Sequence, residues 1–364
     1  MSEKFIPQMV PFFGIEEKDA LSKYMDEGGF LTEFKRTTIF ENLIADFTGA
    51  KHCVVVNNGT ISLTLAALSL GIQAGDEVIV PNYTMVATPN SVKMFGAKPI
   101  FVDVEPDTLC IDISLVEKAI TPKTKAIMLV SANGRYPKSS IEAFQDLATT
   151  NDIKIIEDAA QSLGSYYPNG SHIGTLGDVG SFSFSAPKII STGQGGALIT
   201  NDDETARKIR KLKDFGRSGG GNDIHDVIGY NFKFTELQAC IGIEQMKKLP
   251  QRVDRKKEIF KQYEAQLSDV KEIKLFEHNL NNTAPWFYDC LVEDRENLIA
   301  YLKTKNIGTR IMYPPLNKQL AYNEEGYHPV SEMIGVKGLW LPSAVQLTNF
   351  EIEHICKEIR NFYG

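Results

Sequence analysis

The chain has 364 residues, which is longer than a single hydrophobic core usually supports, so we expect one large and one smaller domain. Its formal net charge of −7 argues against nucleic acid as the main partner, and no apolar run is long enough to cross a bilayer. The first residues lack the pattern of a signal peptide, which indicates a cytoplasmic protein. Five cysteines and six histidines are scattered without ligand spacing, so we expect reduced thiols and no metal site.

Short apolar runs alternate with helical patterns from about residue 50 to about residue 215. The runs that we expect to form strands are 53–56, 77–80, 99–102, 126–130, 153–156, 181–185 and 197–200. Nearly continuous apolar strands with helices between them predict an α/β fold with a mainly parallel sheet covered on both faces. Ligands of such sheets bind beyond the carboxyl ends of the strands, and Asp158 follows one of these ends.

A loop and then a long helix follow the predicted sheet. Residues 216–230 are rich in glycine and polar side chains, which is typical of a loop. Thr235 and Gln238 have the spacing of a capping box, so we expect a helix to begin there. Pro250 should end or kink this helix, because proline lacks the backbone N–H group that the helix needs.

The last part of the chain predicts a smaller α+β domain. A charged helical stretch over 252–267 leads into it, and an amphipathic helix over 351–362 closes it. We therefore divide the chain into a large domain, residues 1–248, and a small domain, residues 249–364.

An acidic residue and a lysine stand at the ends of two predicted strands. The run 153–156 leads into Glu157 and Asp158, and the alternating run 181–185 precedes Lys188. This arrangement suits pyridoxal 5′-phosphate (PLP), because a lysine amine bonds covalently to the cofactor and a carboxylate keeps its pyridine nitrogen protonated. Burial beside the strand would lower the pKa of Lys188 and make the amine a nucleophile. The alternatives are a surface lysine, a helix cap at Asp158 and a solvated charge at Glu157.

A turn between a strand and a helix is a candidate site for a phosphate group. Asn58, Gly59 and Thr60 form this turn, where backbone N–H groups, a hydroxyl and the helix dipole can bind an anion. Ser183 on the sheet could supply a further hydroxyl. The alternatives are an ordinary helix cap for the turn and a simple strand residue for Ser183.

Together these residues closely resemble the DegT/DnrJ/StrS sugar aminotransferases, which are fold-type I PLP enzymes. The resemblance extends from Phe30 to Ser343. It implies a large domain with a mainly parallel seven-stranded sheet, a smaller α+β C-terminal domain and a transaminase activity. The motifs that carry it are Gly59-Thr60, Glu157-Asp158-Ala159-Ala160-Gln161, Ser181-Phe182-Ser183-Phe184, Lys188, Gly193 to Gly196, and Gly229-Tyr230-Asn231-Phe232-Lys233.

The resemblance gives each matching residue a role. It implies that Lys188 bonds to the cofactor and moves protons, that Asp158 pairs with the pyridine nitrogen, and that Gln161 binds the ring hydroxyl. The neighbouring subunit of a homodimer would contribute one phosphate contact, so that the site needs both subunits. The residues expected to hold the phosphate are Gly59, Thr60, Ser183 and, from the neighbouring subunit, Asn231.

Two positions depart from the pattern of the family. The family usually has an aromatic residue after Thr84 that stacks on the cofactor ring, and this chain has Met85, whose thioether can pack on a ring face. Gln194 stands in the glycine cluster where the family usually has Glu, which removes a charge near the lysine loop. Because its thioether can pack on the ring, Met85 stays a candidate for contact with the cofactor.

The resemblance also implies the substrates. The amino donor would be L-glutamate, and the acceptor would be a nucleotide-linked keto sugar. The pattern at 29–34 and 229–234 is most similar to members that aminate the C4 ketone of GDP-4-keto-6-deoxymannose for a surface polysaccharide. UDP- or dTDP-linked sugars, amination at C3 and a non-catalytic regulatory protein with the PLP fold stay open as alternatives. Candidates for substrate contacts, each with surface charge or packing as its alternative, are Arg217, His225, Arg310 and Tyr313.

Overall fold

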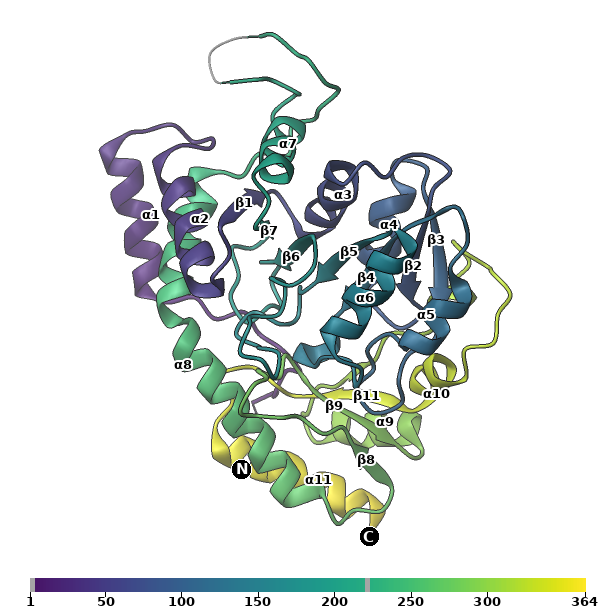
Figure 1. Ribbon diagram of the computed structural model, residues 1–364. Helices are drawn as coiled ribbons and strands as arrows, with labels where there is room; N and C mark the ends of the chain where they lie inside the picture. Colours follow the sequence, from purple (N-terminus) through teal and green to yellow (C-terminus); the bar gives the residue numbers. More distant parts are fainter. Residues whose placement is uncertain (1–3, 220–222) are drawn as a thin grey trace.

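The computed structural model describes residues 4–219 and 223–364, and two β-sheets organise these residues (Figure 1). The strands of the larger sheet are β1 (His52–Val56), β2 (Glu77–Pro81), β3 (Lys98–Val102), β4 (Thr124–Val130), β5 (Lys154–Asp158), β6 (Val179–Ser183) and β7 (Gly196–Thr200). Those of the smaller sheet are β8 (Ile273–Leu275), β9 (Tyr288–Val292), β10 (Arg310–Ile311) and β11 (Gly338–Leu341). The α-helices are α1 (Ile15–Glu27), α2 (Lys35–Thr48), α3 (Gly59–Ser69), α4 (Ala87–Lys93), α5 (Ile113–Ala119), α6 (Ile141–Asn151), α7 (Asp203–Lys213), α8 (Glu236–Leu267), α9 (Arg295–Thr304), α10 (Pro329–Lys337) and α11 (Asn349–Tyr363). Two short 3-10 helices are η1 (Ala132–Gly134) and η2 (Leu316–Lys318).

The large sheet has the strand order β1-β7-β6-β5-β4-β2-β3. β7 runs antiparallel to both of its neighbours, whereas the other pairs are parallel. Successive side chains of a strand point to opposite faces, so Cys53 and Val55 enter one core while Val54 and Val56 enter the other. Both faces are buried, which is why these strands are continuous apolar runs in the sequence. The predicted α/β fold with a mainly parallel sheet is confirmed.

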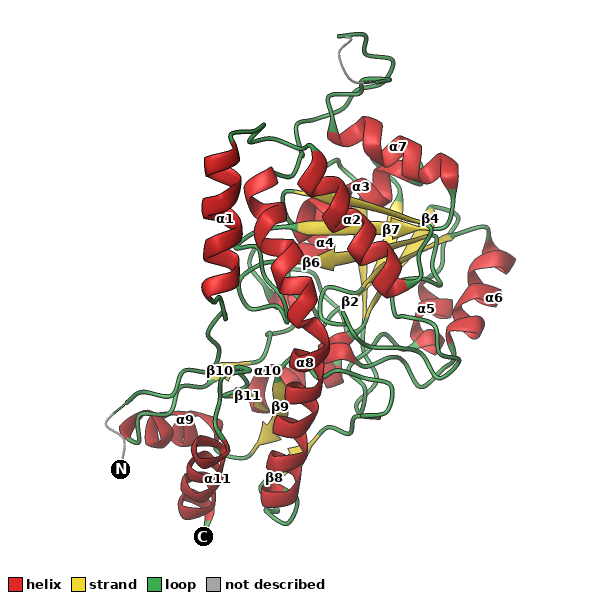
Figure 2. Ribbon diagram, turned by 90° about the vertical axis from the view of Figure 1, so that its left-hand side faces the viewer, coloured by secondary structure: helices red, strands yellow, loops and turns green. Residues whose placement is uncertain are grey.

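Helices cover both faces of the large sheet. α2, α5, α6 and α8 fill the core on one face, where Phe40 and Phe144 are fully buried. α3, α4 and α7 fill the core on the other face, with Leu65, Val92 and Ile209. α1 and α2 both pack against α8, so the three helices form one group at this face of the sheet (Figure 2).

The long helix α8 connects the two sheets. It has 32 residues and begins with the predicted capping box. Pro250 lies inside it, so of the two predicted outcomes, an end or a kink at the proline, the end is wrong. A proline in a helix interior costs about 3 kcal/mol, because the carbonyl of Met246 loses its hydrogen-bond donor. Packing on both sides of the proline offsets this cost: Leu249 is buried in a core of the large sheet, and Phe260 is buried in the core of the small sheet.

The small sheet has the order β10-β11-β9-β8 and is antiparallel. The second half of α8 packs on it together with α9 and α11, and α11 confirms the predicted helix over 351–362. Ile6 also belongs to this core, because it pairs with Ile307 in a parallel bridge. The proposed domain boundary at residue 248 falls inside α8. Among residues 4–219 and 223–364, no helix combines the length and the apolar character that a membrane crossing requires.

A further apolar cluster joins the two sheets. It contains Tyr83, which follows β2, Phe287, which precedes β9, and Trp340 on β11. A buried ion pair crosses the same boundary: Arg135 Nη1, from the loop after β4, donates to Asp289 Oδ1 on β9 at 3.1 Å. The small domain is thus held against the carboxyl ends of the large sheet.

Candidate active site

A cavity of about 480 Å³ lies beyond the carboxyl ends of the large sheet. Its walls come from the segments after β1, β2, β5 and β6 and from the small domain. Another hollow, of about 510 Å³, lies at the opposite edge of the sheet, where it is open and lined by residues such as Lys154 and Asp202. Sequence-predicted residues line only the first of the two, and these are Gly59, Thr60, Met85, Asp158, Gln161, Ser183, Lys188, Arg310 and Tyr313.

Asp158 is the last residue of β5 and is 6% exposed. Thr88 Oγ1 on α4 donates to Asp158 Oδ2 at 2.7 Å, and the backbone N–H of Ala160 donates to Oδ1 at 3.3 Å. Burial raises the pKa of Asp158, while the hydrogen bond from Thr88 and the charge of Lys188 act in the opposite direction. A carboxylate in this position can accept a hydrogen bond from a protonated ring nitrogen in the cavity.

The neighbouring Glu157 has a different task. Its side chain is completely buried and accepts hydrogen bonds from the backbone N–H groups of Gly174, Leu176 and Gly177. The hydroxyl of Tyr167 donates to it at 2.7 Å. The alternative of a solvated charge at Glu157 is therefore wrong, and the residue instead fixes the chain between β5 and β6.

Lys188 lies in the loop after β6, is half-buried and lines the cavity. Burial lowers the pKa of Lys188 to about 8, the charge of Asp158 opposes this shift, and the charge of Arg310 adds to it. The Nζ atom lies 4.3 Å from the centroid of the Trp286 ring. An amine with a lowered pKa beside a buried carboxylate is suited to nucleophilic attack and to proton transfer.

The turn before α3 has the geometry of an anion site. The Asn58 side chain accepts from the N–H of Ile61 at 2.9 Å, so Asn58 is indeed the helix cap. Gly59 and Thr60 begin the helix and line the cavity, and the first N–H groups of a helix lack intrahelical acceptors. A methyl group on Gly59 would lie 2.8 Å from Cβ and 2.9 Å from Oγ of Ser183. Glycine therefore lets the helix start approach the Ser183 hydroxyl closely enough for both to contact one phosphate.

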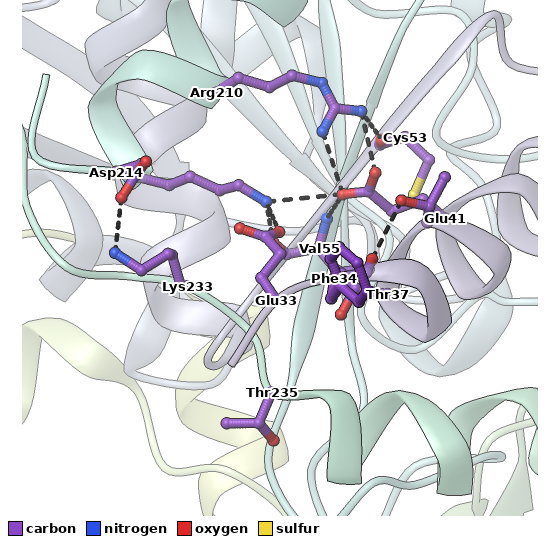
Figure 3. A network of polar contacts seen from close by, with 12 residues as sticks. Glu33, Phe34, Thr37, Glu41, Cys53, Val55, Arg210, Asp214, Lys233 and Thr235 are labelled. Atoms are coloured by element: carbon purple, nitrogen blue, oxygen red, sulfur yellow. Dashed lines mark hydrogen bonds and ion pairs between the residues drawn. The ribbon is translucent and has the colours of Figure 1, made fainter. Parts of the chain in front are cut away.

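Charged side chains hold the edge strand β1 that leads into this turn (Figure 3). Glu41 Oε1 accepts from the N–H of Val55 at 2.9 Å, and Lys213 Nζ donates to the carbonyl oxygen of Val55 at 3.1 Å. Arg210 Nη2 donates to the carbonyl oxygen of Cys53 and to Glu41, each at 3.0 Å. These bonds satisfy backbone groups that an edge strand would otherwise expose, and they keep the turn in place.

Two residues of the site, Trp286 and Asn133, were not identified from the sequence. Trp286 lines the cavity from the small domain, and Asn133 donates its backbone N–H to Gln161 Oε1 at 2.6 Å. Asn133 and Gly134 form a dipeptide that favours turns, which is a usable signal, whereas no local pattern distinguishes Trp286. Gln194 also lines the cavity, in agreement with its expected place near the lysine loop.

The remaining predicted residues separate into two groups. Arg310 and Tyr313 reach the cavity from β10 and the segment after it, and burial raises the pKa of Tyr313 to about 12. Arg217 is paired with carboxylates of its own loop, and His225 contacts a backbone oxygen there. Asn231 is exposed. None of these last three lines the cavity of its own chain among the residues that the structure describes.

Comparison with known proteins identifies the family. Residues 13–360 match the model of the DegT/DnrJ/EryC1/StrS aminotransferase family. The chain belongs to this family. This aminotransferase is 36% identical to GDP-perosamine synthase of Escherichia coli O157:H7 over 99% of both chains. It is also 36% identical to UDP-2-acetamido-2-deoxy-3-oxo-D-glucuronate aminotransferase of Pseudomonas aeruginosa, over 89% of this chain and 90% of the relative.

Solved structures agree with the cofactor assignment. Spr1654 of Streptococcus pneumoniae, a putative sugar aminotransferase, has been solved in a PLP form. It is 25% identical to the aminotransferase, and the two structures superpose with a TM-score of 0.91 over 98% of both chains. A PMP form of the same protein has a TM-score of 0.90, covering 98% of this chain and 98% of the other. The cofactor of the aminotransferase is PLP. The cavity fits it, because a helix start that can accept an anion, a buried carboxylate and an amine of lowered pKa converge there.

Proposed function

We propose that this aminotransferase transfers the amino group of L-glutamate to the C4 ketone of GDP-4-keto-6-deoxymannose, giving GDP-perosamine for a surface polysaccharide. The observation that carries the proposal is end-to-end similarity to GDP-perosamine synthases. Besides the Escherichia coli enzyme, those of Vibrio cholerae and Caulobacter vibrioides are 32% and 33% identical to the chain. The second candidate is a UDP-linked keto sugar, because the Pseudomonas aeruginosa relative reaches the same identity of 36%.

The cavity residues support this reaction by binding, orienting and proton transfer. When bound, PLP supplies an aldehyde that bonds to amino groups and a ring that withdraws electrons from the substrate carbon. The carboxylate of Asp158, which accepts a hydrogen bond from Thr88, would hold the ring nitrogen in its protonated form. Gln161 would orient the ring by a hydrogen bond to the hydroxyl of the cofactor. Gly59, Thr60 and Ser183 hold the phosphate and so set the position of the ring.

Lys188 carries the proton. Its pKa of about 8 leaves part of the amine neutral near neutral pH, so that it can accept a proton from the α-carbon of the donor. The resulting ammonium would then return this proton, and Lys188 would serve as acid and base in the same way when the keto sugar is the substrate. The surrounding walls, including Trp286, limit the access of water to the amine.

We infer that the second substrate enters past the small domain and that the site is completed by a second copy of the chain. Arg310 and Tyr313 line the cavity, where the guanidinium suits a carboxylate or a diphosphate. Exposed large apolar side chains on the neighbouring loops, Phe30, Phe34 and Tyr230, support an interface there. Asn231, expected to reach the phosphate of the other subunit, lies within this exposed region.

The test is an absorption titration of the holoenzyme. L-glutamate should bleach the yellow colour of the bound PLP, and GDP-4-keto-6-deoxymannose should restore it more efficiently than UDP- or dTDP-linked keto sugars. Lys188→Ala should not complete either change. Restoration by a UDP-linked sugar alone would favour the second candidate, and a protein that binds PLP without any response to glutamate would favour a regulatory protein.

A further inference from the structure

We propose that Trp286 is part of the active site, where its indole face holds the amine of Lys188 whenever that amine is not bonded to the cofactor. We further propose that Asn133 is the positioning residue that keeps the indole in this place. The inference rests on the role of Lys188 under the proposed function. It does not depend on which sugar nucleotide is the substrate.

Trp286 contacts the lysine loop in two ways. Its ring lies under the Nζ atom of Lys188, with 4.3 Å between Nζ and the ring centroid. Its Nε1–H donates to the carbonyl oxygen of Pro187 at 2.7 Å. The indole is 3% exposed and lines the cavity, so one side chain fixes both the backbone before Lys188 and the position of the amine.

Asn133 connects this indole to the residues that contact the cofactor. It has a left-handed backbone, with φ of 56°, which directs its side chain to the small domain. Asn133 Oδ1 accepts from the N–H of Phe287, and Nδ2 donates to the carbonyl oxygen of Phe287, each at 2.6 Å. Its carbonyl oxygen accepts from the N–H of Trp286 at 3.3 Å, and its own N–H donates to Gln161 Oε1.

A second bond holds Trp286 from the opposite side. The buried Lys256 on α8 donates from Nζ to the carbonyl oxygen of Trp286 at 2.6 Å and also to the carbonyl oxygen of Ser343. Trp286 is therefore fixed at its N–H by Asn133, at its carbonyl by Lys256 and at its indole N–H by the lysine loop. Two of these anchors hold the backbone of Trp286 and the third holds its indole, so together they set both the position of the residue and the orientation of its ring.

The chemistry of the amine explains why an aromatic face suits this place. During the reaction the free amine of Lys188 takes up one proton and gives it away again, so it must exist briefly as an ammonium. The charged groups that face it are Asp158 on β5, which favours the ammonium, and Arg310 on β10, which disfavours it. A ring face attracts a cation without accepting its proton. Trp286 therefore stabilises the ammonium and still leaves it free to return the proton.

The experiment measures the pKa of Lys188 in the apoprotein, by competitive acetylation and mass spectrometry of the peptide that contains it. The chain has two tryptophans, Trp286 and Trp340, so fluorinated tryptophans can replace both without a change of shape. Fluorination weakens the attraction of the ring face for a cation. We expect increasing fluorination to lower the pKa of Lys188 by about half a unit to one unit in total. In Trp286→Phe, where only Trp340 carries the label, fluorination should have no effect.

Asn133→Gly tests the positioning role. Glycine accepts the left-handed backbone, so this variant removes only the side-chain bonds to Phe287. We expect it to take most of the fluorination effect away. Tyr301→Phe is the matched control, because it removes one side-chain hydrogen bond within the small domain, from Tyr301 Oη on α9 to Glu358 on α11, two helices that do not line the cavity. It should retain the full effect.

Two results would overturn the inference. A pKa of Lys188 that does not respond to fluorination would remove Trp286 from the site, and a full response in Asn133→Gly would remove the positioning role. Both measurements use the apoprotein, so a failure here leaves the transaminase reaction intact. Failure of the proposed function would appear separately, in the absorption titration with L-glutamate.

Discussion

Gly59→Ala places one methyl group in the proposed phosphate site. The new Cβ would lie 2.8 Å from Cβ of Ser183, whereas ordinary contacts begin at 3.4 Å, so the two segments must separate by at least about 0.6 Å. Ser183 cannot retreat easily, because it pairs with Gly196 on β7, and β7 packs so closely on the turn that a Cβ at Gly196 would clash with the carbonyl oxygen of Asn58. The start of α3 must therefore move.

This movement should weaken the binding of PLP more than it lowers the free energy of unfolding. A shift of about 0.6 Å lengthens a hydrogen bond of about 2.9 Å to about 3.5 Å, the limit of a useful bond. A bond to a charged group contributes about 1.5–3 kcal/mol, so we expect the affinity for PLP to fall about 10- to 100-fold. Overpacking alone costs about 1–3 kcal/mol of folding free energy, and part of this is offset because alanine favours the helix.

PLP titration of the apoprotein, followed by absorption, gives the affinity, and urea unfolding gives the stability. Gly242→Ala is the matched control: its Cβ would lie 2.7 Å from the Phe40 ring, inside the contact between α2 and α8 and away from the cavity. It should lose stability and keep its affinity for PLP. Equal PLP affinity in Gly59→Ala and the unmodified chain would refute the phosphate assignment of Gly59.

Three further predictions follow from the contacts described above. In the apoprotein, the rate of covalent PLP attachment should rise as pH increases through about 8, because only the neutral amine of Lys188 attacks; a rate independent of pH in stopped-flow absorption would contradict this. Arg135→Met should lower the free energy of unfolding by about 3–5 kcal/mol, since it leaves Asp289 buried and unpaired, and urea unfolding should show that adding Asp289→Leu recovers most of the loss. Thr88→Val should raise the pKa of Asp158 further and weaken PLP binding by about tenfold or more, and an unchanged affinity in titration would exclude Asp158 from the cofactor site.

The large sheet and the lysine loop could be predicted because their signals are local. Strands buried on both faces appear as apolar runs, and the acid at the end of β5 is visible as an abrupt change of polarity before Asp158. The continuation of α8 through Pro250 could not be predicted in this way. It depends on packing against two cores, which the sequence around the proline does not contain.

Two residues of the site, Trp286 and Thr88, have no local signal. Trp286 is about 100 residues from Lys188 in the chain, and only the contact between the two domains places it beside the amine. Thr88 looks like any threonine at the start of a helix until Asp158 is seen beside it. In the other direction, Arg217 and His225 have suitable chemistry, yet the structure turns them toward their own loop.

The bridge between Ile6 and Ile307 constrains the order in which the protein can be completed on the ribosome. The ribosome makes the roughly 300 residues between these partners in about 15 to 60 s, at rates of about 5–20 residues per second. For that time the segment around Ile6 has no strand to join, while the large sheet is already synthesised. The segment around Ile6 is thus synthesised long before it can take its native place.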